Sequence, residues 1–284
     1  MAEMVLRHNL FECTAPDFKE WVKKTDVVLV PIGSMEQHGP HCPMGCDAIE
    51  AWVSTTKAAV KANVPHTPLL WVGYAVHHML NPSITLRAET LSNVLYDIAR
   101  SLIHHGFNKV IFVNGHTSNL RALDPVLRKI RNDTGALVAV YAVDSANTIP
   151  LYRDLIEGPD ELPGWHGGEI ETSEMLAYNP ELVHLERLKK ESVPKFPKAP
   201  KVFSDKFTKS DGRMNIIFEG YEGITMPLRD LEYIDEGFMG NPFRGNREKG
   251  EKIFEIVSSA LARFIEEIKK VEVKVTNREF TEAL

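Results

Sequence analysis

This 284-residue chain has few cysteines, no excess of positive charge and no long apolar run. Three cysteines, an odd number in a long chain, do not make the disulfide framework of a small secreted domain. With 33 basic against 39 acidic residues, the net charge of −6 argues against a nucleic-acid partner. No stretch approaches the roughly 18 apolar residues of a membrane span, and the N-terminus has no apolar signal core. We therefore expect a cytoplasmic protein with no nucleic-acid or membrane partner.

Apolar runs and amphipathic segments alternate along the chain, and 43% of its residues are hydrophobic. Strands are predicted at residues 27–32, 67–74, 109–113 and 137–143. Helices are predicted at about residues 14–24, 47–63, 89–105, 120–130 and 244–270. Because the runs at 27–32 and 109–113 are continuously apolar, they are typical of strands buried on both faces. The alternation predicts an α/β fold with a mainly parallel sheet.

Length alone allows one large domain or two small ones. Residues 190–213 differ from the rest of the chain because they contain several lysines and prolines. We interpret them as a flap or excursion, since apolar segments resume at Ile216. The chain is then a single domain over residues 1–284.

Residues 32–47, with the sequence IGSMEQHGPHCPMGCD, collect polar side chains directly after a predicted strand. His116 follows the predicted strand at 109–113, and a third group of polar side chains lies in the sequence WHGGEIETS at 165–173. The candidate ligands are Glu36, His38, His41, Asp47, His116, His166, Glu169 and Glu171. Open α/β sheets place their sites at the carboxyl ends of strands, so this placement favours a metal site over an ordinary polar turn.

Carboxylates and imidazoles without thiolates suit Zn²⁺ or Mn²⁺. In an extended stretch, Glu36 and His38 point the same way and bring one oxygen and one nitrogen to neighbouring ions, while Asp47 is placed to bridge them. A pair of ions about 3.5 to 4 Å apart holds a hydroxide, polarises a carbonyl and stabilises the oxyanion that forms. Cys42 and Cys46 have no second cysteine pair for a structural zinc, so they are interpreted as buried small residues.

The motifs resemble those of the creatininase, or creatinine amidohydrolase, family over almost the whole chain. PIGSMEQHGPHCPMGCD is similar to its first signature, NGHTSN to its NGH motif and HGGEIETS to its HAGExETS motif. The stretch GFMGNPFRGNREKGEKIF is similar to its C-terminal motif. The resemblance implies a layered α/β fold with helices on both faces of the sheet, a dinuclear Zn or Mn site and a homo-oligomer, often a hexamer.

Carried over residue by residue, the resemblance implies that Glu36 and His116 hold one ion and that His38 holds the other. Asp47 would bridge the two ions.

The same resemblance makes His166 the acid and base residue, and it makes Glu171 the group that orients or deprotonates the metal-bound water. Members that open creatinine carry a glutamate where this chain has Ser118, and that glutamate completes the second ion's ligands. A carboxylate is still needed, and Glu169 is the nearest candidate, with Glu171 as the alternative.

Five residues are predicted to line the substrate pocket: His77, His78, Asn81, Ser118 and Trp165. The segment at 74–86 departs from the pattern of many members, so we expect a substrate other than creatinine. The paired histidines and Asn81 suit an uncharged polyol.

We expect a metal-dependent hydrolase that opens a small polar ring by attack of a metal-held hydroxide on a carbonyl. If the leaving atom is carbon, the resemblance extends to hydrolases of oxidised inositols such as 3-dehydro-scyllo-inosose. If it is nitrogen, the chain is a cyclic amidase or formamide deformylase. A non-catalytic metal- or sugar-binding homologue is the rival from another class, but it predicts loss of His166 and Glu171, which are both present.

Overall fold

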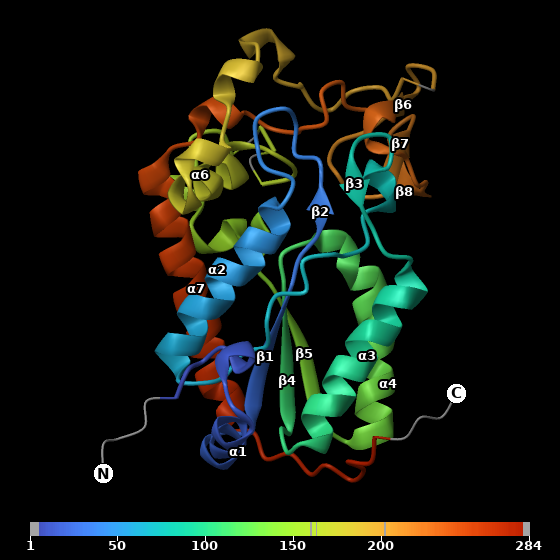
Figure 1. Ribbon diagram of the computed structural model, residues 1–284. Helices are drawn as coiled ribbons and strands as arrows, with labels where there is room; N and C mark the ends of the chain where they lie inside the picture. Colours follow the sequence, from blue (N-terminus) through green and yellow to red (C-terminus); the bar gives the residue numbers. More distant parts are fainter. Residues whose placement is uncertain (1–5, 160, 163, 202, 281–284) are drawn as a thin grey trace.

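A parallel sheet forms the centre of the molecule in a computed structural model, which describes residues 6–280 except 160, 163 and 202 (Figure 1). Its strands lie in the order β1 (Val27–Ile32), β4 (Lys109–Asn114) and β5 (Leu137–Ala142). Every residue of β1 and β4 is buried. A sheet covered on both faces explains their unbroken apolar sequence. The α/β fold with a mainly parallel sheet is confirmed.

The strand predicted at 67–74 is present only as isolated bridges beside the free edge of β1, where Leu29 pairs with His66 and Ile32 with Leu70. The amide of Leu70 donates to the carbonyl of Pro31 at 3.0 Å. A continuous ladder does not form here because Pro31 and Pro68 each lack an amide hydrogen.

Helices cover both faces of the sheet, as expected (Figure 1). The helices are α1 (Ala15–Lys24), α2 (Cys46–Ala62), α3 (Ala88–His104), α4 (Leu120–Thr134), α5 (Ser145–Thr148), α6 (Glu169–Tyr178) and α7 (Arg247–Lys269). Alternate residues of β1 face opposite sides, so that Val28 and Val30 pack toward α3 and α4, while Val27 and Leu29 pack toward α2 and α7.

Helix ends follow local signals in the sequence. The side chain of Thr14 accepts from the amide of Asp17, and the carboxylate of Asp17 accepts from the amide of Thr14, which together cap α1. Helix α7 begins three residues later than predicted because the side chain of Asn246 caps it by accepting from the amide of Lys249. Within the described residues, none of the helices combines the length and apolar character needed to cross a bilayer.

The remaining strands lie at the carboxyl end of the central sheet (Figure 1). They are β2 (Met35–Glu36), β3 (Ser83–Ile84), β6 (Phe207–Thr208), β7 (Asn215–Phe218) and β8 (Tyr221–Thr225). Strands β6, β7 and β8 form a small antiparallel sheet. The excursion predicted over 190–213 therefore continues to Thr225, because the buried side chain of Ile216 belongs to this small sheet.

Candidate metal centre

The loops after β1 and β4 meet at the first turn of α2. A Cβ atom on Gly33 would collide with the backbone of Ala48, and one on Gly115 would collide with the carbonyl oxygen of Asp47. Only glycine permits such close approach of two backbones. The packing brings His116, which follows Gly115, beside Asp47.

Five of the predicted metal ligands and catalytic residues gather at this point, and all of them are buried. The two carboxylate oxygens of Asp47 face different histidines, with His116 Nδ1 at 3.1 Å from one and His38 Nε2 at 3.4 Å from the other. Glu36 Oε2 lies 3.3 Å from His116 Nε2, and Glu171 Oε2 lies 3.8 Å from His38 Nε2. Asp47 thus stands between two sets of nitrogen and oxygen atoms.

Several atoms of this cluster fit a bound metal better than a hydrogen-bond network. Although nitrogen and oxygen atoms lie nearby, the geometry leaves Glu36 Oε1, His38 Nε2 and Asp47 Oδ2 without a hydrogen-bond partner in the described part of the chain. Burying such atoms is costly unless they are paired or coordinate a metal. Their side chains supply ligand atoms within 4.8 Å of one another, and oxygen with imidazole nitrogen suits Zn²⁺ or Mn²⁺.

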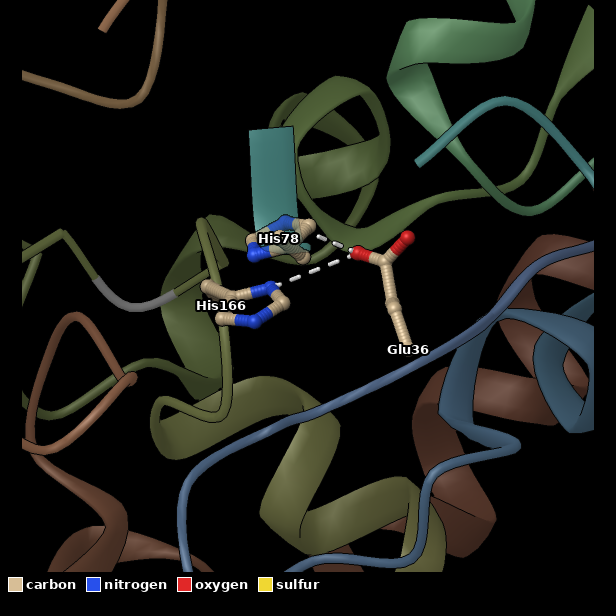
Figure 2. A group of neighbouring side chains, drawn as sticks. All are labelled: Glu36, His78 and His166. Carbon is tan, nitrogen blue, oxygen red and sulfur yellow. Dashed lines mark ion pairs between the residues drawn. The ribbon is translucent and has the colours of Figure 1, made fainter. Parts of the chain in front are cut away.

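Figure 2 shows the rings of His78 and His166 next to the carboxylate of Glu36. His78 Nε2 lies 3.0 Å and His166 Nδ1 3.8 Å from Glu36 Oε1, and the two rings stack with centroids 4.3 Å apart. The ring nitrogens of His166 and His78 that face away from Glu36 contact other groups of the protein. His166 Nε2 donates to the carbonyl of Gln37 at 2.6 Å, and His78 Nδ1 lies 3.2 Å from Asp230 Oδ2.

The two stacked histidines differ in charge. Burial alone would lower the pKa of His78, but Glu36 and Asp230 raise it to about 9. Burial lowers the pKa of His166 well below its usual value, and the charge of His38 lowers it further. His166 is therefore neutral near pH 7 and keeps a lone pair on Nδ1, because Nε2 carries the hydrogen donated to Gln37.

Glu169 points away from the cluster. Its Oε1 lies 2.5 Å from Lys249 Nζ and accepts from the amide of Glu157, while Oε2 accepts from the amide of Gly158. Because residues two apart in a helix lie on nearly opposite sides, α6 directs Glu171 toward His38 and Glu169 toward α7. The structure therefore does not support the prediction that Glu169 is a ligand.

A cavity of about 300 Å³ opens onto the cluster. Four of the five predicted pocket residues line it: His77, His78, Ser118 and Trp165. Asn81 does not, because its side chain donates to Asp230 Oδ2 at 3.3 Å.

The other polar residues of the first motif pack behind the cluster. His41 Nε2 donates to the carbonyl of Gly167 at 2.9 Å, so it braces the loop before α6. Cys42 and Cys46 are buried free thiols that pack with Met175. The contacts of Cys42 and Cys46 agree with their interpretation as buried small residues, whereas His41, a candidate ligand by sequence, braces a loop instead.

The sequence reasoning missed two residues that hold the histidines. Asp230, on a 3₁₀ turn after the small sheet, faces His78 across 152 residues of sequence. Its neighbours are typical of a charged surface turn, so the sequence carries no signal for it. Gln37 stands between two predicted ligands and holds His166 through its main-chain carbonyl.

A pair of buried carboxyl groups lies behind Glu171. The hydroxyl of Ser145 lies between two carboxyl groups: it donates to Glu171 at 3.1 Å, and an oxygen of Glu50 lies 3.4 Å away. Glu50 contacts Glu174, and both side chains are buried. Burial raises the pKa of Glu174 to about 8, and it raises the pKa of Glu50 as well.

We expect Glu174→Gln to stabilise the protein at high pH. Because the pKa of Glu174 rises from 4.5 to about 8 on folding, the folded chain binds more protons between these values, and its stability falls as the pH rises through them. The variant lacks this loss, so its advantage in the free energy of unfolding should grow by about 4 kcal/mol between pH 5 and pH 9. Urea unfolding at both pH values measures it. Exposed Glu272→Gln is the control, and a difference independent of pH would contradict the prediction.

A family model named creatininase, described as creatinine amidohydrolase, matches residues 11–265. The chain belongs to the creatininase family. Creatinine amidohydrolase of Pseudomonas putida is 28% identical to it over 277 residues, which are 90% of this chain and 95% of the relative. The 3-dehydro-scyllo-inosose hydrolase of Thermotoga maritima is 28% identical over 180 residues, which are 61% of this chain and 57% of the relative.

Solved structures of creatininase share the fold. A manganese form has a TM-score of 0.69 and 26% sequence identity, and covers 93% of this chain and 99% of its own. A mutant creatininase of Zn–Zn type has a TM-score of 0.68 at the same identity, covering 93% and 98%. The resemblance seen in the sequence is thus confirmed, and the family is one of hydrolases whose members bind manganese or zinc.

Proposed function

We propose that this chain is a dinuclear metal-dependent hydrolase that cleaves a bond at a carbonyl of a small polar ring. Glu36, His116 and Asp47 would hold one ion, and His38, Asp47 and Glu171 the other. The observation that carries the proposal is Asp47, whose two oxygens face two different histidines, His38 and His116. Two bound ions supply polarisation of the carbonyl, a lowered pKa of water and stabilisation of the developing oxyanion.

Side chains of this chain transfer the proton of the attacking water. His166 is neutral and presents Nδ1 toward the cluster, so it accepts the proton of the attacking water and delivers it to the leaving atom. The carbonyl of Gln37 fixes the tautomer that this role requires. Glu171 lines the cavity beside His38, where its carboxylate also orients the attacking water.

We propose C–C cleavage of an oxidised inositol of the 3-dehydro-scyllo-inosose type as the first reaction to test. Similarity to the Thermotoga maritima hydrolase supports it, and so does Ser118 in the place where creatinine-opening members carry glutamate. The alternative is hydrolysis of a C–N bond in a cyclic amide or formamide, favoured by the match over 95% of the Pseudomonas putida enzyme. A non-catalytic homologue that keeps the metal ions would not need His166 in the cavity.

Metal analysis followed by a hydrolysis screen tests this function. We expect zinc or manganese in the purified protein and turnover of one substrate among 3-dehydro-scyllo-inosose, creatinine and simple formamides. His166→Ala should keep the metal and lower kcat by about 10² to 10⁴, the usual share of an acid and base residue. Partly exposed His184→Ala is the control. A protein without metal, or an unchanged kcat in His166→Ala, would refute the mechanism.

We also propose a homo-oligomer, a hexamer by family resemblance, in the cytoplasm. Met79, Leu80 and Ile84 are apolar and 43–54% exposed around β3, and contact with a second copy would cover them. The free thiols suit a reducing compartment. Light scattering of the purified protein measures the assembly, and a monomeric mass would contradict this proposal.

A further inference from the structure

A second cavity of about 180 Å³ adjoins the cavity at the metal centre, and we call it the side cavity. Ser118 and Arg121 line both cavities on one side, and Gly212 and Arg213 of the excursion line both on the other. Because the two cavities share these walls, a molecule held at the metal centre can extend into the side cavity.

The side cavity has the opposite charge to the metal centre. Its lining includes four cationic side chains: Arg121, Lys209, Arg213 and Arg229. Among the residues that the structure describes, no aspartate or glutamate lines it. Four carboxylates line the cavity at the metal centre: Glu36, Asp47, Asp144 and Glu171. A ligand that spans both cavities therefore meets carboxylates at one end and cations at the other.

Arg121 and Arg213 have guanidinium groups available for a ligand. Within the described part of the chain, Arg121 has no ion pair or side-chain hydrogen bond, and it lies over the ring of Tyr74 at 5.8 Å. Among the same described residues, the guanidinium of Arg213 makes a single long ion pair, 3.8 Å from its Nε to Asp211, and it lies over the ring of Trp165. The two groups approach the side cavity from different segments, α4 and the excursion. Arg229 differs, because its guanidinium is bound to a carboxylate, that of Glu232, at 2.8 Å.

Lys209 adds a buried cation. Only 2% of its surface is exposed, and its amine donates to the carbonyls of Arg213 and Asn215. No carboxylate forms an ion pair with it among the described residues, although Asp211 lies close enough to affect its pKa, which burial lowers to about 8. A buried charge without a counter-ion is costly, so a bound anion would stabilise it.

We propose that the side cavity binds an oxyanion, a carboxylate or a phosphate, carried by the substrate on a part that does not react. Guanidinium groups form paired hydrogen bonds with both oxyanions, and Arg121 and Arg213 are placed to do so. The proposal rests on the proposed function only in placing the reacting carbonyl at the ions. Creatinine carries no carboxylate or phosphate. An oxidised inositol would supply the oxyanion for the side cavity only as an acidic derivative.

Calorimetric titration of the metal-loaded protein tests the proposal with three probes: inorganic phosphate, acetate and uncharged glycerol. We expect at least one anion to bind and glycerol not to bind. Arg121→Gln and Arg213→Gln should each weaken the anion about tenfold or more, as loss of a charged hydrogen bond does. Arg128→Gln, on the same helix but exposed and paired with Asp124, is the matched control and should bind as the wild type does. Which anion binds distinguishes a phosphate from a carboxylate.

Bound metal ions can also hold anions, and the variants separate the two sources. Equal anion affinity in the wild type, Arg121→Gln and Arg213→Gln would assign the anion to the ions and overturn the proposal. Binding of neither anion would overturn it as well. Metal content is measured in every sample, so that a chain without zinc or manganese whose phosphate affinity still depends on Arg121 would refute the proposed function and support the side cavity.

Discussion

Asp47→Asn is expected to remove the bound metal and to abolish hydrolysis. The two oxygens of Asp47 face His116 and His38, so one substitution weakens both ion positions at once. An amide contributes no charge and only one oxygen to two cations. We expect metal content to fall from about two ions per chain to fewer than one, and kcat/KM to fall by at least about a thousandfold. Elemental analysis and the rate measure these changes.

The matched control is Asp124→Asn, because Asp124 is exposed on α4 and pairs only with Arg128 among the described residues. It should leave metal content and rate unchanged. Heat unfolding gives a second readout, since a ligand that binds only the folded state stabilises it. A chelator should lower the Tm of the wild type and leave that of Asp47→Asn unchanged. Full metal content in Asp47→Asn would remove this residue from the ligand set.

Lys249→Met is expected to cost about 3–5 kcal/mol of the free energy of unfolding, the usual result of leaving a buried charge unpaired. Glu169 is 1% exposed, and Lys249 of α7 is its cationic partner at 2.5 Å. Lys249 also donates to Glu157 and to the carbonyl of Arg244, so its loss frees several groups where α6 and α7 pack. Urea unfolding measures the change.

Lys252→Met is the control, because Lys252 is exposed and pairs with Glu248. It should cost less than about 1 kcal/mol. The double variant with Glu169→Gln should recover part of the loss, since it removes the unpaired charge.

Glu169→Gln alone should keep the metal that Glu171→Gln loses. Loss of metal in Glu169→Gln would restore Glu169 as a ligand.

Local signals explain which parts of the fold could be predicted from the sequence. The apolar runs of β1 and β4 identify buried strands because both faces of the sheet are covered. The start of α1 was predicted to within one residue, because the capping residue Thr14 directly precedes the helix in the sequence. The strand predicted at 67–74 does not form a ladder because its Pro68 and the neighbouring Pro31 of β1 both lack an amide hydrogen, and the part played by Pro31 is clear only once β1 is known to be the neighbour.

The sequence motifs predicted which segments form the site, but they did not predict which side chains in those segments face one another. Choosing between Glu169 and Glu171 requires knowing that α6 begins at Glu169, which turns the two side chains to opposite sides. Asp230 meets His78 only because the excursion folds back over the carboxyl end of the sheet. The cationic side cavity likewise combines α4 with the excursion, and no periodicity in the sequence reports such contacts.

The close approach of Gly115 to Asp47 also has a consequence for biosynthesis. Strand β1 pairs with β4, whose first residue, Lys109, follows Val27 by 82 positions (109 − 27), and the proposed ligands run from Glu36 to Glu171. A nascent chain emerging from the ribosome therefore lacks part of the ligand set until more than half of it has been translated. Helix α7, which anchors α6 through Lys249, emerges later still. Metal loading should accordingly follow translation, because binding is coupled to folding of nearly the entire polypeptide.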